Sequence, residues 1–567
     1  MKPPSLRPVS DFAFEQPRQR VSELRRRLPL TLGILVLAVV ALAIRLPGLD
    51  HRPMHGDEAN QAVKAGVLFE TGHYRYDPEE HHGPTLYWFT LPSLWLSGAS
   101  QFAETRERDY RIVPVVFGAA LILLLFLLAD GLSAGPLLAA ALLTAISPAM
   151  VYYSRYYIQE TLLVFFTVAT IGCLWRWFRG QSLAWAVAAG TSVGLMHSTK
   201  ETWILAAAAM GVGLVATVLW TRWRDGTPLT WPPYLRPIPL LAAMVAACLV
   251  AIVFYSSFGT DWKGPVDSVL AYKTYLRRGS ESGIHAAPWY EYLRWLVAFR
   301  PARGFFWSEG LIVGLAVCGG VFALVRRQPG SGGAASGTPS AEAVAAGPSS
   351  IFSRFLALYT LVLLGLYSAI PYKTPWCLLS FLHGMVLLAG VGVYAVMAWA
   401  RFAPLRAILG GLLLLATAHL GWQTYWLNFR LDADQRNPYV YAHTSRDVLN
   451  LAAQMERLAR AAPRGFGMVI HVVMPENYWP LPWYLRRFEQ DRIGYWQDAA
   501  AWASDSAQGP APEVILLSPE VSPIVDAHLR SAYNQQMMFG LRPGVFVSAY
   551  VREDLWRAFL ESGAGRP

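Results

Sequence analysis

The fold of this chain is decided by the stretch HGDEANQAVKAGVLFETG at residues 55–72, which follows closely on the first long apolar run. The adjacent carboxylates of Asp57 and Glu58 therefore lie just outside a predicted membrane span. Further along, the string HHGPTLYW adds His81 and His82. Acidic and imidazole side chains at the end of a helix bundle are costly unless they bind or react with something. The pattern indicates chemistry at a membrane surface.

The composition of the chain is that of a membrane protein. Of its 567 residues 54% are hydrophobic and only 15% are charged, and the mean hydropathy is +0.31. A soluble protein would carry about a quarter charged residues. The net charge of +10 comes from arginines clustered in short segments between apolar runs, so we expect no nucleic-acid partner. The four cysteines lie within or beside apolar runs, and no CxxC pair is present. This argues against a disulfide framework or a zinc site of that kind.

Apolar runs long enough to cross the ~30 Å hydrocarbon core of a bilayer recur along the chain. We therefore expect an α-helical polytopic membrane protein with about eleven transmembrane helices. These spans are predicted near 29–47, 111–129, 134–152, 158–178, 183–198, 203–221, 238–258, 306–325, 354–370, 376–399 and 406–424.

Arginine-rich connections set the orientation of these spans, because such connections stay on the cytoplasmic side of a cell membrane. The tail 1–28 is then cytoplasmic, and the transmembrane domain comprises residues 29–425. Residues 48–110 form a long first outer loop, in which the short run 86–98 is expected to be an interfacial or partly inserted helix. The Gly/Ala/Ser/Pro-rich segment 328–350 is predicted to be a disordered cytoplasmic linker.

The character of the sequence changes after about residue 425. Short strand-like patterns replace the long apolar runs, namely GMVIHVVM, DRIGYW, PEVILLSP and GVFVSAYV, with helical stretches between them. Residues 426–567 are therefore predicted to form an extracytoplasmic α/β domain. The domain has neither a GxGxxG motif after a strand nor a P-loop, so no nucleotide site is predicted there.

Asp57 and Glu58 are the first candidates for catalysis. A carboxylate near a polar–apolar boundary can act as a general base, and burial can raise its pKa toward neutrality. The second acid can orient the first or bind a divalent cation through oxygen. A structural alternative is that Asp57 simply caps the helix that follows it.

Three cations on outer turns are candidates for binding a lipid phosphate, and all three lie on the same side of the membrane as Asp57. They are Arg155 in SRYYIQE, Lys200 in HSTKETW and Lys373 in PYKTPW. The planar fork of arginine suits a phosphate especially well. The alternatives are an Arg155–Glu160 ion pair that anchors two helices, and lysines whose charged ends simply reach the interface.

Polar and aromatic neighbours of these groups are candidates for contacting the substrate. His81 and His82 precede a Gly-Pro turn and could ligate a metal or donate to a phosphate, although they could also be a solvated pair. No HExxH motif is present, which argues against a zinc hydrolase. The other candidates on the outer turns are Tyr156, Glu160 and Glu201.

Taken together, the strings HGDEA, HHGPTLYW, SRYYIQE, STKETW and PYKTPW resemble the C-type, multi-spanning glycosyltransferases. Their spacing is similar to that of the protein O-mannosyltransferases and aminoarabinose transferases. It looks most like a prokaryotic branch labelled as flippase-activity-associated in archaeal protein glycosylation. The resemblance covers residues 29–425 well and the C-terminal domain weakly.

This resemblance implies a hexosyl or pentosyl transferase that takes a polyprenyl-phosphate-linked sugar and passes it to a protein, lipid or glycan acceptor on the outer face. By that analogy Asp57 is the base for the acceptor hydroxyl, and Arg155 meets the lipid phosphate. Glu58, with His82 or Glu160, would support the base or hold a divalent metal.

Two other functions remain open from the sequence. A transporter or lipid-linked sugar flippase would show polar or broken spans near the midplane, whereas these spans are mostly unbroken with charges at their outer ends. A non-catalytic partner of a glycan assembly machinery is the third possibility, and an intact Asp57 argues against it.

Overall fold

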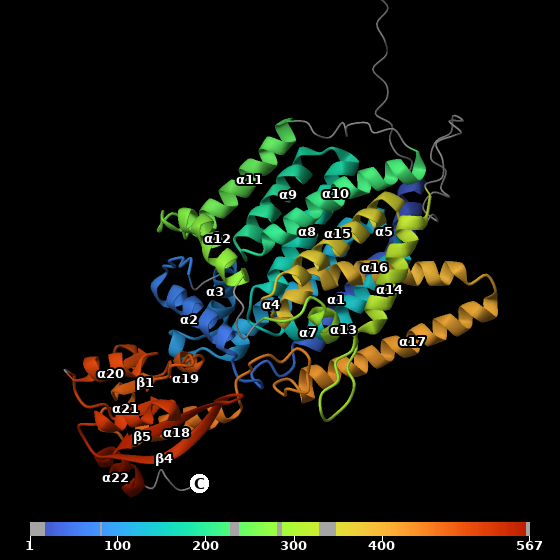
Figure 1. The fold of residues 1–567 in the computed structure, drawn as a ribbon. Helices are drawn as coiled ribbons and strands as arrows, with labels where there is room; N and C mark the ends of the chain where they lie inside the picture. The colour runs from blue at the N-terminus through green and yellow to red at the C-terminus, as the bar shows by residue number, and fades with distance from the viewer. Residues whose placement is uncertain are drawn as a thin grey trace, which may run out of the picture.

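A bundle of long helices and a small sheet domain at one of its ends make up this protein (Figure 1). The computed structural model describes residues 17–79, 82–226, 237–280, 286–327, 347–507 and 509–562. The predicted fold class, a polytopic helical protein with a C-terminal α/β domain, is confirmed. The predicted linker 328–350 lies outside the described residues up to position 346, and so do the first 16 residues of the predicted tail.

Eight helical segments in the described ranges are long and apolar enough to cross a membrane. Several of them merge neighbouring elements, such as η4 with α16. The elements involved are α1 (Pro17–Arg45), α4 (Glu107–Leu124) with η2 (Leu125–Leu128) and α5 (Ala129–Leu132), α8 (Glu160–Gly180), α10 (Trp203–Asp225), α11 (Pro237–Tyr255), α15 (Ser350–Ala369), η4 (Pro375–Leu378) with α16 (Leu379–Trp399), and α17 (Ala403–Tyr425) with η5 (Trp426–Arg430).

The other three predicted spans are also helical, but they are broken or short. The span predicted at 134–152 is a pair, α6 (Ala134–Ile146) and α7 (Pro148–Ser154), bent by 58°. The break has a clear cause, since Pro148 cannot donate to the preceding turn and the Ser147 side chain caps the new helix through Met150 N–H. The two short helices are α9 (Leu183–His197) and α14 (Gly310–Val325).

Small residues let the spans approach closely, as is usual in membrane helix bundles. α14 and α16 make the most extensive contact in the bundle. A Cβ atom on Gly319 would lie 2.1 Å from the carbonyl oxygen of Leu388, and one on Gly392 would lie 2.0 Å from that of Leu315. Neither position can carry a side chain without forcing the two helices apart.

One end of the bundle, which we call the domain side, carries two helices of the predicted first outer loop (Figure 1). They are α2 (Gly56–Thr71) and α3 (Thr85–Ser97), and α3 packs on α2 and α4. The 13 residues of α3 cover only about 20 Å at 1.5 Å per residue, too short for the ~30 Å hydrocarbon core. This length is compatible with the interfacial or partly inserted helix expected at 86–98, which stays a prediction. The helices α12 (Gly264–Ser280) and α13 (Glu291–Val297) follow later in the chain.

The C-terminal domain is built on a five-stranded sheet in the order β2-β1-β3-β5-β4. β1 pairs in parallel with β2 and β3, while β5 runs antiparallel to β3 and β4. Four strands match the predicted patterns, whereas the bulged edge strand β4 was not predicted. The elements are α18 (Asp447–Ala461), β1 (Ile470–Val473), α19 (Leu481–Tyr484), β2 (Ile493–Trp496), α20 (Ala499–Ser506), β3 (Val514–Leu517), α21 (Ser522–Ala527), β4 (Tyr533–Arg542), β5 (Val545–Arg552) and α22 (Glu553–Glu561).

Hydrogen bonds join this domain to both ends of the first loop. Met54 N–H donates to the hydroxyl of Tyr484 at 2.9 Å, and Trp483 Nε1 donates to Glu107 at 3.1 Å. Arg486 donates to the carbonyl of Thr105 at 2.7 Å. The domain therefore lies directly beside the stretch that carries Asp57.

Candidate functional site

Asp57 lies in the first turn of α2, where its side chain is 53% exposed. The alternative reading of this residue as a helix cap is wrong, because the cap is His55. The Nδ1 atom of His55 accepts the main-chain N–H of Asp57 at 3.0 Å. The Asp57 carboxylate lies 4.0 Å from the same imidazole. It thus projects from the domain side without a closer ionic partner among the described residues.

Glu58 is fully buried, and both oxygens of its carboxylate accept hydrogen bonds. Arg111 donates two hydrogen bonds to the carboxylate at 2.8 and 2.7 Å, and Arg52 lies 3.5 Å away. The main-chain N–H groups of Tyr157 and His55 donate to it at 2.9 and 3.1 Å. Burial alone would raise the pKa of Glu58, but the two arginines outweigh it and hold this pKa well below its usual value. Glu58 therefore ties the first loop to α4 and to the SRYYIQE turn.

The sequence analysis did not single out Arg111, although its side chain bonds to several groups at the start of the first loop. Besides gripping Glu58, its guanidinium donates to the carbonyls of Leu49, Arg52 and Pro53 at 2.6 to 3.1 Å. An arginine at the first turn of an apolar run was the available signal, since buried arginines in membrane proteins are paired.

The guanidinium of Arg155 donates hydrogen bonds to main-chain carbonyls. It donates to Pro47 O at 2.7 Å and more weakly to Gly48 O and Asn428 O, and it stacks over the ring of Phe429. It thereby clamps the end of α1 to the π-helical turn after α17. The ion pair with Glu160 considered from the sequence is not formed, because Glu160 pairs with another residue.

Lys200 and Glu160 form a buried ion pair between two turns. Burial alone would lower the pKa of Lys200, but the Glu160 carboxylate reverses this and raises it. The neighbouring Glu201 pairs with His82 Nδ1 at 2.8 Å and accepts the Tyr76 hydroxyl at 3.2 Å. The HSTKETW turn is therefore bonded to both the SRYYIQE turn and the first loop.

Lys373 is buried at the C-terminal end of α15. Its ammonium donates to the carbonyls of Ser368 at 2.8 Å, of Tyr367 at 3.4 Å and of Ile370. Burial lowers the pKa of this lysine. Since an ammonium has three donors, these carbonyls already occupy its hydrogen-bonding capacity.

The predicted metal ligands are not brought together. Glu58 pairs with Arg111, Glu160 with Lys200, and His82 with Glu201. Across the residues that the structure describes, no group of three or more His, Cys, Asp or Glu side chains is placed to hold a metal ion. His81 falls outside the described residues. Each of Glu58, His82 and Glu160 thus takes part in a different ion pair, and a divalent metal at this set stays a prediction.

The C-terminal domain contributes groups near Asp57 that the sequence analysis did not find. Burial raises the pKa of Tyr441 to about 12, with further contributions from Tyr372 and from the charge of Asp57. Burial lowers the pKa of Arg542, against which the charges of Glu476 and Asp57 act. The side chain of Trp479 passes within 3.4 Å of the Cβ position of Gly56.

His55 links Asp57 to that domain. Because its Nδ1 accepts from Asp57, its Nε2 carries the proton and donates to Tyr441 O at 3.0 Å. Burial lowers the pKa of His55, which keeps the ring neutral. Its ring lies 5.5 Å from that of Tyr156 and 5.7 Å from that of His443. Tyr156 thus packs against the histidine that caps α2, and its predicted contact with the substrate stays a prediction.

Four buried oxygen atoms on α2 and on the two turns have no hydrogen-bond partner in the described structure. α2 is joined to the first turn by a 2.9 Å bond between Gln159 and Gln61, and the two turns are joined by the Lys200–Glu160 pair. Buried polar atoms normally have hydrogen-bond partners, so these four oxygens suit a polar ligand. The four atoms are Asn60 Oδ1, Gln159 Oε1, Glu160 Oε2 and Ser198 Oγ.

Comparison with known proteins agrees with this architecture. Residues 85–260 match the dolichyl-phosphate-mannose-protein mannosyltransferase family. The crystal structure of ArnT from Cupriavidus metallidurans bound to undecaprenyl phosphate is 15% identical, with a TM-score of 0.62, and the match covers 91% of this chain and 97% of that one. The archaeal oligosaccharyltransferase AglB from Archaeoglobus fulgidus, in complex with an inhibitory peptide and a dolichol-phosphate, is 11% identical with a TM-score of 0.51. That match covers 94% of this chain and 77% of the other. No curated protein sequence matches significantly. The chain has the fold of these structures, that of the C-type glycosyltransferases, which confirms the predicted resemblance at the level of the fold. The assignment to the branch labelled as flippase-activity-associated stays a prediction.

Proposed function

We propose that this multi-pass membrane protein transfers a hexosyl or pentosyl group from a polyprenyl-phosphate donor to an acceptor hydroxyl at Asp57. The observation that carries the proposal is the placement of Asp57, a half-exposed carboxylate held by His55 on the domain side of a C-type fold. Among the described residues, the other acidic candidates Glu58, Glu160 and Glu201 are each held in an ion pair.

The reaction is a single displacement. Asp57 takes the proton of the acceptor hydroxyl while the acceptor oxygen forms a bond to C1 of the sugar. The bond between C1 and the phosphate oxygen breaks, and its electron pair leaves with the polyprenyl phosphate. Because Glu58, Glu160 and Glu201 are held in ion pairs, none of them is assigned a covalent intermediate, and the single displacement inverts the configuration at C1, by the same logic that separates inverting from retaining glycosidases.

We propose Lys200 as the main cation for the donor phosphate. Within the described structure its ammonium bonds only to Glu160, which leaves two N–H donors for phosphate oxygens. The ammonium of Lys373 already bonds to three carbonyls, and the guanidinium of Arg155 already bonds to carbonyls of two chain segments. The unpartnered oxygens of Asn60 and Gln159 would then accept hydrogen bonds from sugar hydroxyls.

A reconstituted transfer assay tests the function. Purified protein, radiolabelled polyprenyl-phosphate hexoses and pentoses, and membrane extracts as acceptors should give labelled product. Asp57→Asn should abolish transfer without changing the thermal midpoint, while Asp491→Asn, an exposed acid in the C-terminal domain, should be fully active. Activity of the Asp57→Asn protein would overturn the assignment. Lipid-linked sugar crossing a vesicle membrane without transfer would favour the flippase instead.

We also propose that the domain side faces the outside of the cell membrane and that the N-terminus is cytoplasmic. A cysteine at the exposed position Ser504, in a chain whose native cysteines are replaced, should react with an impermeant maleimide added to intact cells. Reaction only after the cells are opened would reverse the topology.

A further inference from the structure

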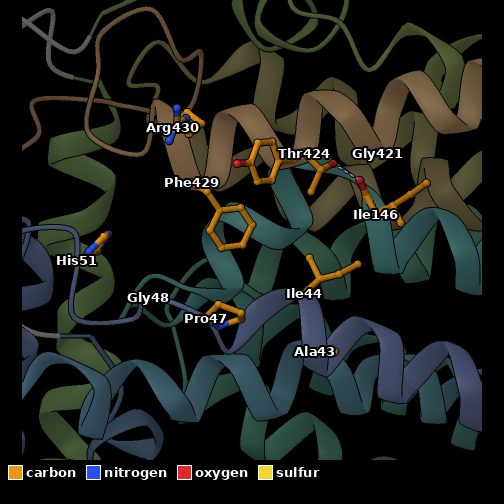
Figure 2. Close-up of a pocket in the computed structure, with 11 residues that line it drawn as sticks. Ala43, Ile44, Pro47, Gly48, His51, Ile146, Gly421, Thr424, Phe429 and Arg430 are labelled. Carbon is orange, nitrogen blue, oxygen red and sulfur yellow. Dashed lines mark hydrogen bonds between the residues drawn. The ribbon is translucent and has the colours of Figure 1, made fainter.

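A groove of about 550 Å³ lies between the domain-side ends of α1 and α17 (Figure 2). Its walls include Ala43, Ile44 and Phe429, and its floor is Ile146 at the break between α6 and α7. Only 17% of the residues of the α1 span and 6% of those of the α17 span are buried inside the protein. Both walls are therefore lipid-facing helices, and the groove opens toward the bilayer.

The floor of the groove is apolar for a specific reason. A break between two helices leaves main-chain carbonyls without partners, which is costly inside a membrane. Here the Thr424 hydroxyl donates to the carbonyl of Ile146 and removes that polar group from the groove, as Figure 2 shows. Gly421 lacks a side chain at the adjacent turn of α17, and nothing lies within 4 Å of its Cβ position. This part of the groove is therefore open and lined by apolar groups.

Polar and positively charged side chains lie at one end of this groove. Arg430 and His51 are exposed and lie at the end opposite Ala43 and Ile146 (Figure 2). Arg155 adds charge from behind, since its Nη2 atom lies 3.9 Å from the Cβ position of Gly48 in the groove wall. Gly48 has a φ of +66°, which favours glycine and keeps this wall thin.

We propose that the groove binds one hydrocarbon chain of an anionic membrane phospholipid, with the phosphate of its headgroup at Arg430 and His51. Apolar walls match the chain, and the cationic end matches the headgroup at the membrane surface. A volume of about 550 Å³ holds a chain segment and leaves the rest of the lipid in the bilayer.

The occupant is a phospholipid rather than the sugar donor because the groove is closed toward the catalytic loop. Arg155 bonds Pro47 O and Asn428 O, which clamps together the two segments between the groove and the cluster of Arg52 and Arg155. The gap behind that clamp measures only about 10 Å³, roughly one water. The bonds of Arg155 therefore lie between a headgroup at Arg430 and the cluster of Arg52 and Arg155.

Lipid titration of the full-length protein in detergent, followed by native mass spectrometry, tests this assignment. The probes are dioleoylphosphatidylglycerol, dioleoylphosphatidylcholine with the same chains, and undecaprenyl phosphate. We expect the anionic phospholipid to bind the wild-type protein more tightly than the neutral one. Arg430→Gln should weaken the binding of dioleoylphosphatidylglycerol alone among the three probes, by about fivefold, the equivalent of ~1 kcal/mol for one cation at an anionic surface.

One groove variant and two controls outside the groove separate the site from general lipid adhesion. Gly421→Leu fills the groove without a clash and should abolish the preference for the anionic phospholipid. Gly411→Leu, on the same helix with equally open space but outside the groove, should bind like wild type, as should Arg401→Gln at the other end of α17.

Three results would overturn the proposal: equal affinity for the two phospholipids, unchanged binding by Gly421→Leu, or a loss in Arg430→Gln that affects undecaprenyl phosphate instead. The last result would make the groove part of the donor site. Because binding is measured without turnover, each outcome is independent of whether the proposed transferase activity is correct.

Discussion

His55 Nδ1 accepts the main-chain N–H of Asp57 at 3.0 Å, and the same ring donates through Nε2 to Tyr441 O at 3.0 Å. One neutral imidazole thus caps α2, which carries the proposed base in its first turn, and bonds this helix to the C-terminal domain. The helix cap and the link to the domain therefore depend on a single side chain.

Replacing His55 should reduce turnover more than donor binding. In His55→Ala the cap and the link to Tyr441 are both lost, so we expect kcat to fall by roughly 10²-fold through misplacement of the base. The Michaelis constant for the donor should change little, because the proposed phosphate ligand Lys200 is untouched. Steady-state kinetics with a defined donor measures both constants.

His55→Asn is the matched control for this effect. Asparagine is among the best N-cap residues, so the start of α2 is retained while the bond to Tyr441 O is lost. We expect most of the activity to return. If His55→Asn were as inactive as His55→Ala, the link to the C-terminal domain, and not the helix cap, would position Asp57.

Glu58 should behave as a structural residue, in contrast to its neighbour. Glu58→Gln leaves Arg111 and Arg52 without their counter-charge in a buried site, which typically costs about 3–5 kcal/mol. We expect poor yield and a lower thermal midpoint in detergent. Asp57→Asn should keep the wild-type midpoint, and so should Glu520→Gln, an exposed acid. A stable but inactive Glu58→Gln protein would instead show that Glu58 takes part in the chemistry.

Much of the fold was predictable because hydrophobic length and arginine bias are properties of local sequence. All eleven predicted spans are helical, and four of the five strands were predicted. The break at Ser147 and the edge strand β4 were not, since the first depends on one Ser-Pro step inside a continuous apolar run. β4 begins with the polar residues YNQQ and contains bulges that disturb its alternation.

The site was predictable in position but not in its pairings. The sequence placed Asp57, Arg155 and Lys200 on one side of the membrane, and the structure has all three on the domain side. It could not show that Lys200 pairs with Glu160, or that Arg155 binds carbonyls. Such partners come from segments far apart in the chain and depend on how the helices pack.

Lys200 and Lys373 make a matched pair for locating the donor phosphate. Loss of a charge-assisted hydrogen bond costs roughly 1.5–3 kcal/mol, so Lys200→Gln should raise the Michaelis constant for the donor by about 10- to 100-fold. Lys373→Gln removes the cap of α15 and should lower the thermal midpoint while leaving donor kinetics unchanged. The reverse assignment, with donor binding lost only in Lys373→Gln, would move the phosphate site to the PYKTPW turn.

His443 should make the protein sensitive to mild acid. Its ring is buried, neither nitrogen has a hydrogen-bond partner in the described structure, and it lies near the charges of Arg52 and Arg111. Burial, reinforced by Arg52, lowers the pKa of His443 well below its usual value, and burial also lowers that of His55. The unfolded chain therefore binds more protons than the folded one once the pH drops below about 6.5, the ordinary pKa of histidine. Stability is then full above that pH and decreases as the pH falls.

His443→Phe isolates this contribution. Phenylalanine keeps the ring contacts with His55 and Tyr156 and removes a buried group that has no hydrogen bond, so the thermal midpoint at pH 7.5 should be equal or higher. Between pH 7 and 5 the midpoint of the variant should fall less steeply than that of the wild type. The control is His528→Phe, which changes an exposed ring on the C-terminal domain and should leave the wild-type slope intact. An unchanged slope in His443→Phe would assign the acid sensitivity to other groups, with His55 the first to test.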